Sequence, residues 1–305
     1  MAVQRQGLDR SIGMGASKAG EATVTMPSPR KEKKPTSPWV AAALVGVSVL
    51  FLIPFLWLLA ASLKTRSEVF GPEVIPHPFA WNNYSQVWRI APVLRWFFNS
   101  VLVGALAAGS VVISSALVAF GFAYFRFRGR GVLFGLVLAT MMLPGAVTMI
   151  PTFLIWDYLG WTNTQVPLWA HNLFGSAFYT FMLRQFFLTI PRDLFEAARV
   201  DGANYLQVWW RIAMPLSKPA LIVVALFEFK ASWTDLLRPL IYLSEEAQFT
   251  LPLGLKTLLD QFGAHGIQAW ELVMAASVIS TIPMLVLFFV AQRHFVEGIS
   301  TTGIK

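Results

Sequence analysis

Six long apolar stretches constrain this chain more than any other feature of its sequence. Each is near or above the roughly 20 residues that a helix needs to cross about 30 Å of hydrocarbon. A helix satisfies its own backbone hydrogen bonds, which lipid cannot do, so stretches of this length predict membrane-spanning helices. The predicted spans are residues 39–63, 97–124, 131–157, 166–189, 216–238 and 272–292. We therefore expect an all-α polytopic membrane protein with six transmembrane helices.

The composition agrees with this fold class. Charged residues make up 13% of the chain, against about 25% in soluble domains. The chain has no cysteine, which excludes disulfides and thiolate metal sites. The net charge of +8 is compatible with nucleic-acid binding, but basic residues also collect in the cytoplasmic loops of membrane proteins.

The first 38 residues differ from the rest of the chain. Residues 1–38 are rich in Gly, Ser, Pro and charge, include the run "RKEKKP", and show no apolar period. We expect a disordered cytoplasmic tail here, followed by a transmembrane domain over residues 39–305. The tail is not a signal peptide, because the first apolar stretch begins too late and runs too long. Within the spans, Pro54, Pro144 and Pro283 predict helix kinks.

The distribution of Lys and Arg predicts the orientation. With the N-terminus inside, 17 of the 24 basic residues fall on inner segments, 6 on outer segments and 1, Lys230, within a span. Without the 7 in the tail, 10 inner residues still exceed the 6 outer ones. By the positive-inside rule both termini are cytoplasmic. The segment 190–215 between the fourth and fifth spans is then cytoplasmic too.

Two outer segments carry sequence features of their own. Residues 64–96 contain "PEVIPHPFAWNNYSQVW", and residues 239–271 carry Glu245, Glu246, Asp260 and Glu271. Either segment could face a soluble partner outside the membrane. The alternative, that both are ordinary connecting loops, stays open.

The polar insert 190–215 is unusual in such an apolar chain. Pro191 ends the fourth span, and Asp193 precedes Glu196 by the spacing of a capping box, which predicts a short helix from about residue 194. Ala197 and Ala198 keep that helix narrow, so that another surface can approach it closely. Gly202 then interrupts it.

A second helix is predicted after Gly202. Asn204 and Gln207 repeat the capping-box spacing. Four apolar residues then follow at i, i+3, i+4 and i+7, which predicts one apolar stripe: Leu206, Trp209, Trp210 and Ala213. Pro215 ends this pattern just before the fifth span. From these residues alone, the insert is either an interfacial linker or a docking element for a cytoplasmic partner.

The insert resembles a known family. "EAARVDGA" followed by "MPLSKP" looks like the EAA motif of binding-protein-dependent ABC importer permeases. The matching residues are Glu196, Ala197, Ala198, Gly202 and Pro215, and Asp201 and Ala203 are as in the sugar-importer branch. "SWTDLLRPLIYL" at 232–243 and the ending "RHFVEGISTTGIK" also resemble that branch. The resemblance covers nearly all of residues 39–305 and is closest to maltose-permease G-type subunits.

The resemblance implies a type I ABC importer permease fold and a set of partners. Those partners are a second, related permease subunit, two cytoplasmic ATPases and an extracytoplasmic binding protein that delivers sugar. Glu196, Ala197, Ala198, Asp201, Gly202 and Pro215 would form the ATPase-coupling element. The segment after Arg293 would also reach the ATPases.

The sequence itself predicts a transport subunit and not an enzyme. It contains no G-x-x-x-x-G-K-[ST] phosphate loop and no G-x-S-x-G elbow, so ATP and Mg would be bound by the partner ATPases. The four histidines, His77, His171, His265 and His294, have no metal-ligand spacing. We expect no cofactor on this chain.

Charges within the fifth span suggest where substrate passes. Glu228 and Asp235 are seven residues apart and are predicted to share a face, with Lys230 and Trp233 on another edge. One hypothesis makes these four residues a pathway wall, in which Trp233 stacks on sugar and Asp235 accepts hydroxyl hydrogen bonds. The other makes Glu228 and Lys230 a pair satisfied against the partner permease.

The family comparison leaves the substrate contacts open. The family's motif here usually reads Trp-Asn, a polar residue, then Phe-Leu-Trp-Pro-Leu, and this chain departs from it at Thr234, Leu236, Leu237 and Arg238. In the maltose system the other permease chiefly holds the sugar. Asp157 and Trp161, at the outer end of the third span, are further candidates.

Other transport functions remain alternatives. An ABC permease for glycerol phosphate or a polyol would carry the same coupling motif. An ion-coupled secondary transporter would need inverted repeats and midplane ionisable relays, and no convincing repeat is present.

Overall fold

The computed structural model describes residues 37–263 and 268–302, with side chains as far as Phe289 and at Gln292. Within these ranges all regular structure is helical, as predicted. The predicted disordered tail lies outside the described residues except for Ser37 and Pro38. The side chains of the family-like ending from Arg293 onward also lie outside them.

The chain divides into two units, residues 1–50 and 51–305. In the first unit the described residues are the beginning of α1 (Pro38–Ser62), and all of them are exposed. This apolar, uncovered surface matches the predicted first span. The second unit holds the remaining helices.

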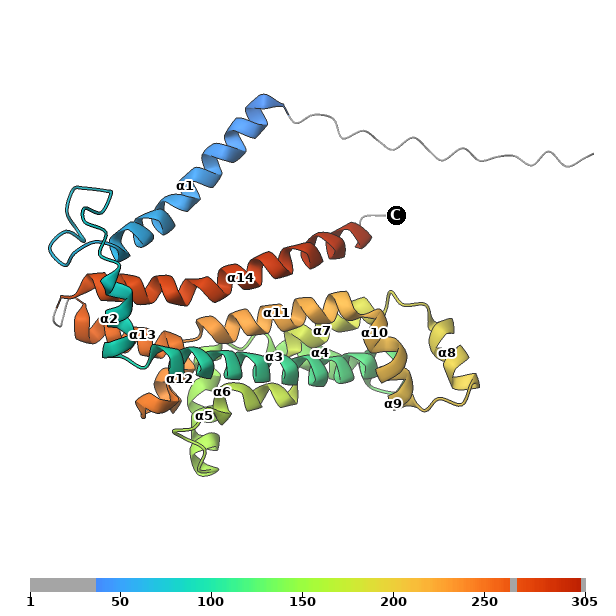
Figure 1. Cartoon of the computed structure of the whole chain (residues 1–305). Coiled ribbons are helices and arrows are strands. Elements are labelled where there is room, and N and C mark those ends of the chain that lie inside the picture. Colours follow the sequence, from blue (N-terminus) through green and yellow to red (C-terminus); the bar gives the residue numbers. More distant parts are fainter. Residues whose placement is uncertain (1–36, 264–267, 303–305) are drawn as a thin grey trace, which may run out of the picture. The chain divides into compact units, whose positions relative to one another are not determined.

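The helices of the second unit follow one another closely along the chain (Figure 1). Before the insert they are α2 (Asn82–Ile90), α3 (Val93–Tyr124), α4 (Arg130–Thr140), α5 (Gly145–Tyr158), α6 (Val166–Trp169), η1 (Ala170–Phe174) and α7 (Ala177–Phe187). The insert contains α8 (Arg192–Val200), α9 (Tyr205–Val208), the π-helical turn η2 (Trp209–Ala213) and α10 (Met214–Leu216). Then come α11 (Lys218–Thr234), α12 (Leu237–Tyr242), η3 (Glu246–Gln248), α13 (Leu251–Phe262) and α14 (Trp270–Thr302).

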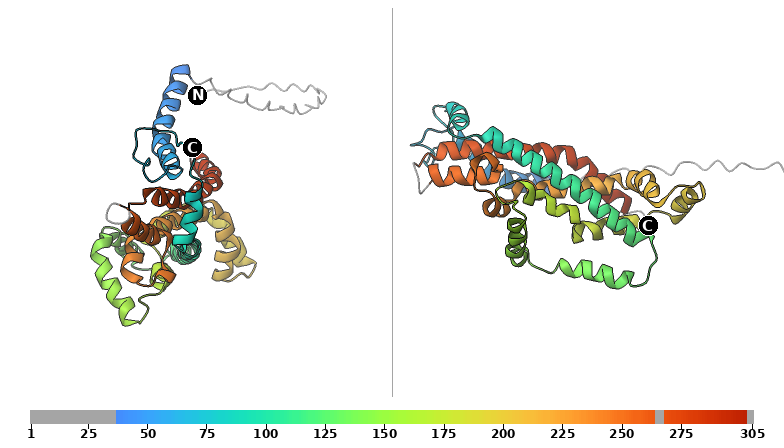
Figure 2. Two further views of the ribbon diagram at one scale, coloured as in Figure 1. Left: turned by 60° about the vertical axis from the view of Figure 1, so that its left-hand side comes forward. Right: turned by 90° about the horizontal axis from the view of Figure 1, so that it is seen from below.

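Helix α3 is the centre of this unit, and α7 and α11 pack along it (Figures 1 and 2). Its inward face is built largely from small residues, which allow close helix packing: Gly104, Ala107, Ala108, Ala116, Ala119 and Ala123 are buried. At Gly104 the approach is closest, since a Cβ there would lie 2.9 Å from the Phe229 ring of α11. Small side chains on α3 therefore fix how near α11 can come.

The predicted outer segment 239–271 contains α12, η3 and α13. Of these, η3 and α13 pack on α3, and α12 packs on α6. Asn99 of α3 donates to the carbonyls of Ala247 and Phe249, at 3.0 and 2.9 Å. A Cβ on Gly254 of α13 would lie 2.1 Å from Trp96, so only glycine fits this contact.

The two outer segments are tied together. Arg66 in segment 64–96 pairs with Glu271 at 3.1 Å. In the same segment, Asn83 of α2 donates to the carbonyls of Ser62 and Lys64, both at 2.9 Å. Both segments therefore have a defined structure that contains a helix, and whether either faces a soluble partner stays a prediction.

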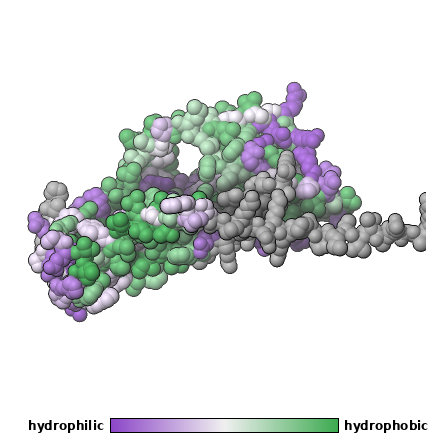
Figure 3. All heavy atoms as spheres, turned by 90° about the horizontal axis from the view of Figure 1, so that it is seen from above, coloured by the Kyte–Doolittle hydropathy of each residue, from purple (hydrophilic) through white to green (hydrophobic). Residues whose placement is uncertain are grey.

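Of the predicted spans, three correspond to one continuous helix each in the described residues: α1, α3 and the part of α14 from Trp270 to Phe289. Two bent helix pairs raise the number of candidate spans to at most five. In Figure 3, hydrophobic residues make up much of the coloured surface. The apolar surface agrees with a membrane protein, although the six-helix count goes beyond these helices.

The predicted third span, 131–157, is broken between α4 and α5, whose axes differ by 96°. Pro144 stands at the break with extended backbone angles, φ −60° and ψ 134°. Proline lacks an amide hydrogen and disfavours helix in the residue before it, so the chain leaves the helix here. Pro144 thus separates two helices, while Pro54 and Pro283 lie inside continuous ones.

The predicted fourth and fifth spans are also discontinuous. In 166–189 the chain passes through η1 and Gly175, which has φ 79° and ψ 164°, before α7 begins. These angles are accessible essentially only to glycine. In 216–238 the helix starts after a bend of 81° near Ser217 and ends at Thr234. The length of an apolar stretch predicts where a span lies, but local backbone chemistry decides whether it stays helical.

Candidate functional site

The insert forms a short exposed helix, α8, which begins at Arg192, two residues earlier than a capping box at Asp193 would allow. Pro191 is the residue before the helix, and no side chain caps the helix start. Asp193 is already inside the helix, where its side chain cannot reach back as a cap. The predicted capping box of Asp193 and Glu196 is therefore wrong, while the predicted helix is present.

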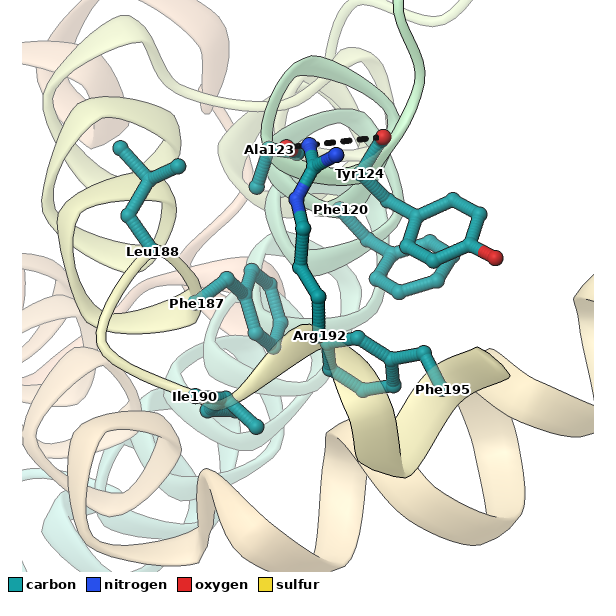
Figure 4. A pocket seen from close by; sticks show the side chains of 8 residues that line it. All are labelled: Phe120, Ala123, Tyr124, Phe187, Leu188, Ile190, Arg192 and Phe195. Carbon is teal, nitrogen blue, oxygen red and sulfur yellow. Dashed lines mark hydrogen bonds between the residues drawn. The ribbon is translucent and has the colours of Figure 1, made fainter. Parts of the chain in front are cut away.

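Phe195 anchors α8 to the membrane domain (Figure 4). Its side chain is 3% exposed. Its ring lies 5.8 Å from that of Phe120 and 5.6 Å from that of Tyr124, both near the end of α3, in edge-on geometry. Ala198, one turn later, packs on the same cluster. Displacing α8 would therefore displace the end of α3.

Arg192 makes a second connection between α8 and α3. Its guanidinium donates to the carbonyls of Ala123 and Tyr124, at 3.4 and 3.3 Å (Figure 4). These carbonyls belong to the last turn of α3, which has no further helical partners for them. Beside these contacts is a cavity of about 30 Å³, which is room for little more than one water molecule.

The opposite face of α8 is open. Asp193, Glu196, Ala197 and Val200, at i, i+3, i+4 and i+7, are all exposed. Val200 is 88% exposed, an unusual position for an apolar side chain next to charged ones. A narrow face with a central alanine, acidic groups and an uncovered valine is suited to insertion into a groove of another protein. The EAA residues are thus divided: Glu196 and Ala197 face outward, and Ala198 faces the core.

Gly202 forms the turn that ends α8. Its φ is +86°, in the left-handed region that other residues rarely adopt, and no atom lies near the position of an added Cβ. Arg199 closes the turn from one side, because its guanidinium lies over the Tyr205 ring at 4.2 Å and donates to the Ala203 carbonyl. The predicted interruption at Gly202 is confirmed.

The second predicted helix begins as expected. The Asn204 side chain accepts a hydrogen bond from the backbone N–H of Gln207. The Gln207 side chain accepts one from the backbone N–H of Asn204, and both bonds are 2.8 Å long. This is the predicted capping box.

The predicted apolar stripe is confirmed at Trp209 and Ala213 and is wrong at Leu206 and Trp210. Val208, Trp209 and Ala213 are buried, whereas Leu206 and Trp210 are exposed. The physical reason is η2, since a π-helical turn has more residues per turn than the α-helix assumed for the stripe. Pro215 follows within α10, and the axis then turns by 81° into α11.

Glu228 is held by a neighbour that the sequence hypotheses do not include. It is buried in α11, and Asn172 of η1 donates to its carboxylate at 2.6 Å. The Ser114 hydroxyl of α3 donates a hydrogen bond to the backbone carbonyl of Asn172, at 2.7 Å. Glu228 therefore joins three elements at the break in the fourth span. Lys230 is exposed and makes no ion pair with the described residues.

Trp233 and Asp235 are less accessible than the pathway hypothesis assumes. Trp233 is 4% exposed and packs between Phe97 and Phe229. Asp235 follows the end of α11, so it does not share a helical face with Glu228. It forms an ion pair with Arg238 at 2.8 Å. Arg238 in turn donates to the ring nitrogen Nε2 of His171.

The two further candidates lie at the end of α5, Asp157 in its last turn and Trp161 just after it. Trp161 stacks on Trp156, with ring centroids 5.6 Å apart, and Asp157 accepts from Thr162 at 3.4 Å. No group of three or more His, Asp or Glu side chains suited to a metal ion occurs in the described part of the chain.

Sequence reasoning missed three residues that hold the site. Phe195 and Arg192 position α8, and Asn172 satisfies Glu228. Phe195 had a detectable signal, since it is the one aromatic residue within the short polar helix. Asn172 had none, because its partner is far away in the sequence.

Residues 112–301 match the family described as binding-protein-dependent transport system inner membrane component. Curated relatives are similar in sequence to this chain over most of their length. The arabinooligosaccharides transport system permease protein AraQ of Bacillus subtilis is 32% identical, with 85% of this chain and 92% of that protein covered. The sn-glycerol-3-phosphate transport system permease protein UgpE of Yersinia enterocolitica is 34% identical, with 84% and 92% covered.

Solved structures share the fold. A chain of a bacterial ABC transporter involved in the import of the acidic polysaccharide alginate superposes with a TM-score of 0.73 at 25% identity, covering 84% of this chain and 95% of that one. A bacterial alginate ABC transporter in complex with a periplasmic protein bound to alginate pentasaccharide gives 0.58 at 16% identity, covering 83% and 92%.

The chain combines apolar helices of membrane-spanning length with an exposed helix that carries the EAA residues. This combination is typical of membrane permeases. This chain belongs to the family of binding-protein-dependent transport system inner membrane components. The predicted resemblance to ABC importer permeases is confirmed. It is a transport subunit of the inner membrane.

Proposed function

We propose that this permease carries a sugar or oligosaccharide, delivered by an extracytoplasmic binding protein, through an ATP-driven importer. The observation that supports it best is α8, which presents Glu196 and Ala197 outward and is anchored by Phe195 to α3. The named relatives include a permease for arabinooligosaccharides. Carbohydrate is therefore the substrate class we favour.

The proposed partners are a second permease and two ATPases. One ATPase groove receives the exposed face of α8, with Val200 and Ala197 as the contact and Gly202 as the turn behind it. Motion of that ATPase reaches the membrane domain through Phe195 and Arg192, which connect α8 to the end of α3. ATP and Mg belong to the ATPases, and this chain carries no catalytic role.

The proposed topology has six crossings with both termini cytoplasmic. In this topology α4 and α5 together make the third crossing, and η1 and α7 together make the fourth. The bent pair that ends in α11 makes the fifth crossing. This arrangement puts the insert on the cytoplasmic side, where ATPases are found. The excess of Lys and Arg on the same side supports it.

A glycerol-phosphate substrate is the second candidate, favoured by the 34% identity to the sn-glycerol-3-phosphate permease. Uptake into proteoliposomes that contain the whole importer and its binding protein separates the two. Transport of labelled oligosaccharide, without competition from glycerol 3-phosphate, is the expected result. Transport of glycerol 3-phosphate alone would exclude the carbohydrate proposal.

The coupling role of the insert is tested at Gly202. Valine at a φ of +86° costs about 1–2 kcal/mol in backbone strain, so Gly202→Val is expected to lower uptake and ATPase co-purification by roughly tenfold. Asparagine adopts a positive φ more readily than valine. Gly202→Asn should therefore keep most of the uptake and most of the ATPase co-purification.

A matched control is Gly160→Val. Gly160 has a similar φ, +72°, and likewise no atom near an added Cβ, but lies in the connection after α5. Uptake should survive this change. If Gly202→Val transports normally, the turn is not part of the coupling element.

The pathway is tested at Asp235. Its carboxylate pairs with Arg238, so Asp235→Asn frees the guanidinium as well as removing a charge. We expect an altered KM for the transported sugar with unchanged ATPase co-purification. Unchanged kinetics for every transported sugar would remove Asp235 from the pathway.

A further inference from the structure

Arginines gather at the end of α3 that carries the insert. Arg126, Arg128 and Arg130 lie in or beside the connection to α4, and Arg184 comes from α7. None of the four forms an ion pair with a carboxylate among the described residues. Arg126 and Arg128 are exposed and also have no hydrogen bond there. This part of the surface therefore carries uncompensated positive charge.

Arg130 and Arg184 are held in place near each other. Arg130 donates to the Phe125 carbonyl at 3.1 Å, and Arg184 donates to the Phe122 carbonyl at 3.4 Å. The Arg184 guanidinium also lies 4.2 Å from the centre of the Phe134 ring. Phe134 belongs to α4, the helix that begins at Arg130, so Arg184 packs against the same helix as Arg130.

Helix α4 adds to the positive field. Its first residue follows Gly129, no side chain caps it, and its first turn contains no acidic residue. The first amides of a helix carry partial positive charge, and they suit an anion such as phosphate. Here they lie in the same segment as the arginines, which supply the full charges.

The surface next to the arginines is apolar. Helix α4 buries none of its residues. Val132 is 71% exposed and Leu136 is 59% exposed, one turn apart on α4. Phe127, between Arg126 and Arg128, is exposed too. Positive charge followed directly by an uncovered apolar helix matches a molecule with an anionic head and a hydrocarbon tail.

We propose that Arg126, Arg128, Arg130 and Arg184 bind the phosphate of an anionic phospholipid, with an acyl chain against α4. The positive-inside rule accounts for basic residues in the α3–α4 connection. It does not account for the fixed position of Arg184, which comes from another helix and is held over the Phe134 ring and against the Phe122 carbonyl. An acidic soluble protein would satisfy the arginines but leave Val132 and Leu136 uncovered, so we commit to lipid.

The test measures lipid selectivity of the importer complex in phosphatidylcholine nanodiscs. Spin-labelled phosphatidylglycerol and spin-labelled phosphatidylcholine report the immobilised fraction of each lipid. The wild type should prefer phosphatidylglycerol. One basic residue near an anionic surface contributes about 1 kcal/mol, so Arg130→Gln with Arg184→Gln should reduce the preference on the order of tenfold.

Further variants keep the test decisive. Arg126→Gln with Arg128→Gln changes exposed side chains that make no hydrogen bond or ion pair with the described residues, so it should lower the preference without affecting the fold. Arg89→Gln with Arg95→Gln, which removes equal charge on α2 and at the beginning of α3, should leave it intact.

Four results would overturn the proposal. The first two are equal immobilisation of both lipids by the wild type and a full preference in both arginine pairs of variants. The third is displacement of the lipid by millimolar inorganic phosphate, which would indicate a soluble anion. The fourth is a preference that is lost only when an ATPase is bound, which would indicate an acidic protein surface. Because the readout is lipid binding, it does not depend on whether the coupling proposal holds.

Discussion

Phe195 is the side chain that joins the exposed helix α8 to the membrane domain, through the rings of Phe120 and Tyr124. Replacing it with alanine removes nearly all of this contact, at about 3–5 kcal/mol for a buried Phe→Ala change. We expect Phe195→Ala to stay in the membrane but to lose most uptake. Faster amide hydrogen exchange, confined to α8, would report the loosened helix.

Phe195→Leu is the companion variant. Leucine refills much of the volume without the ring contacts, so uptake should recover at least in part. Normal uptake by Phe195→Ala would mean that α8 transmits motion through another connection, of which Arg192 is the candidate.

At the scale of elements, α13 depends on one glycine. A Cβ at Gly254 would lie 2.1 Å from Trp96, which is itself fully buried and hydrogen-bonded to the Glu246 carbonyl at 3.1 Å. Overpacking of this kind costs about 1–3 kcal/mol. Gly254→Ala should therefore lower the Tm of the purified protein and displace α13 from α3.

Gly109→Ala is the control at this scale. Gly109 lies in α3, and nothing lies within 4 Å of an added Cβ. Alanine favours helix over glycine by about 1 kcal/mol, so the Tm should stay the same or rise. A fall in Tm as large as that of Gly254→Ala would show that the contact with Trp96 is not the cause.

At the scale of the whole molecule, the topology can be measured directly because the chain has no cysteine. Ser67→Cys and Ser244→Cys, both exposed, should react with an impermeant maleimide in intact spheroplasts. Val200→Cys should react only after permeabilisation, in cells that lack the ATPase subunits. Labelling of Val200→Cys in intact spheroplasts would reverse the proposed orientation.

Much of the insert was predictable because its signals are local. The capping box at Asn204 and the left-handed turn at Gly202 depend on residues within a few positions of each other. The stripe through Leu206 and Trp210 was not predictable, since a π-helical turn changes which side chains face the core. Asp193 failed as a cap because the helix begins before it.

The sequence by itself determined the helical class, the location of the apolar stretches and the EAA helix, because hydrophobic length, charge and turn chemistry act over short distances. Only the tertiary structure decided which helices break, which face of α8 is open and what surrounds Glu228. It also placed Arg184 over Phe134 of α4 and packed the outer segment 239–271 onto α3. Such contacts join residues that are far apart in the chain, and packing in three dimensions selects them.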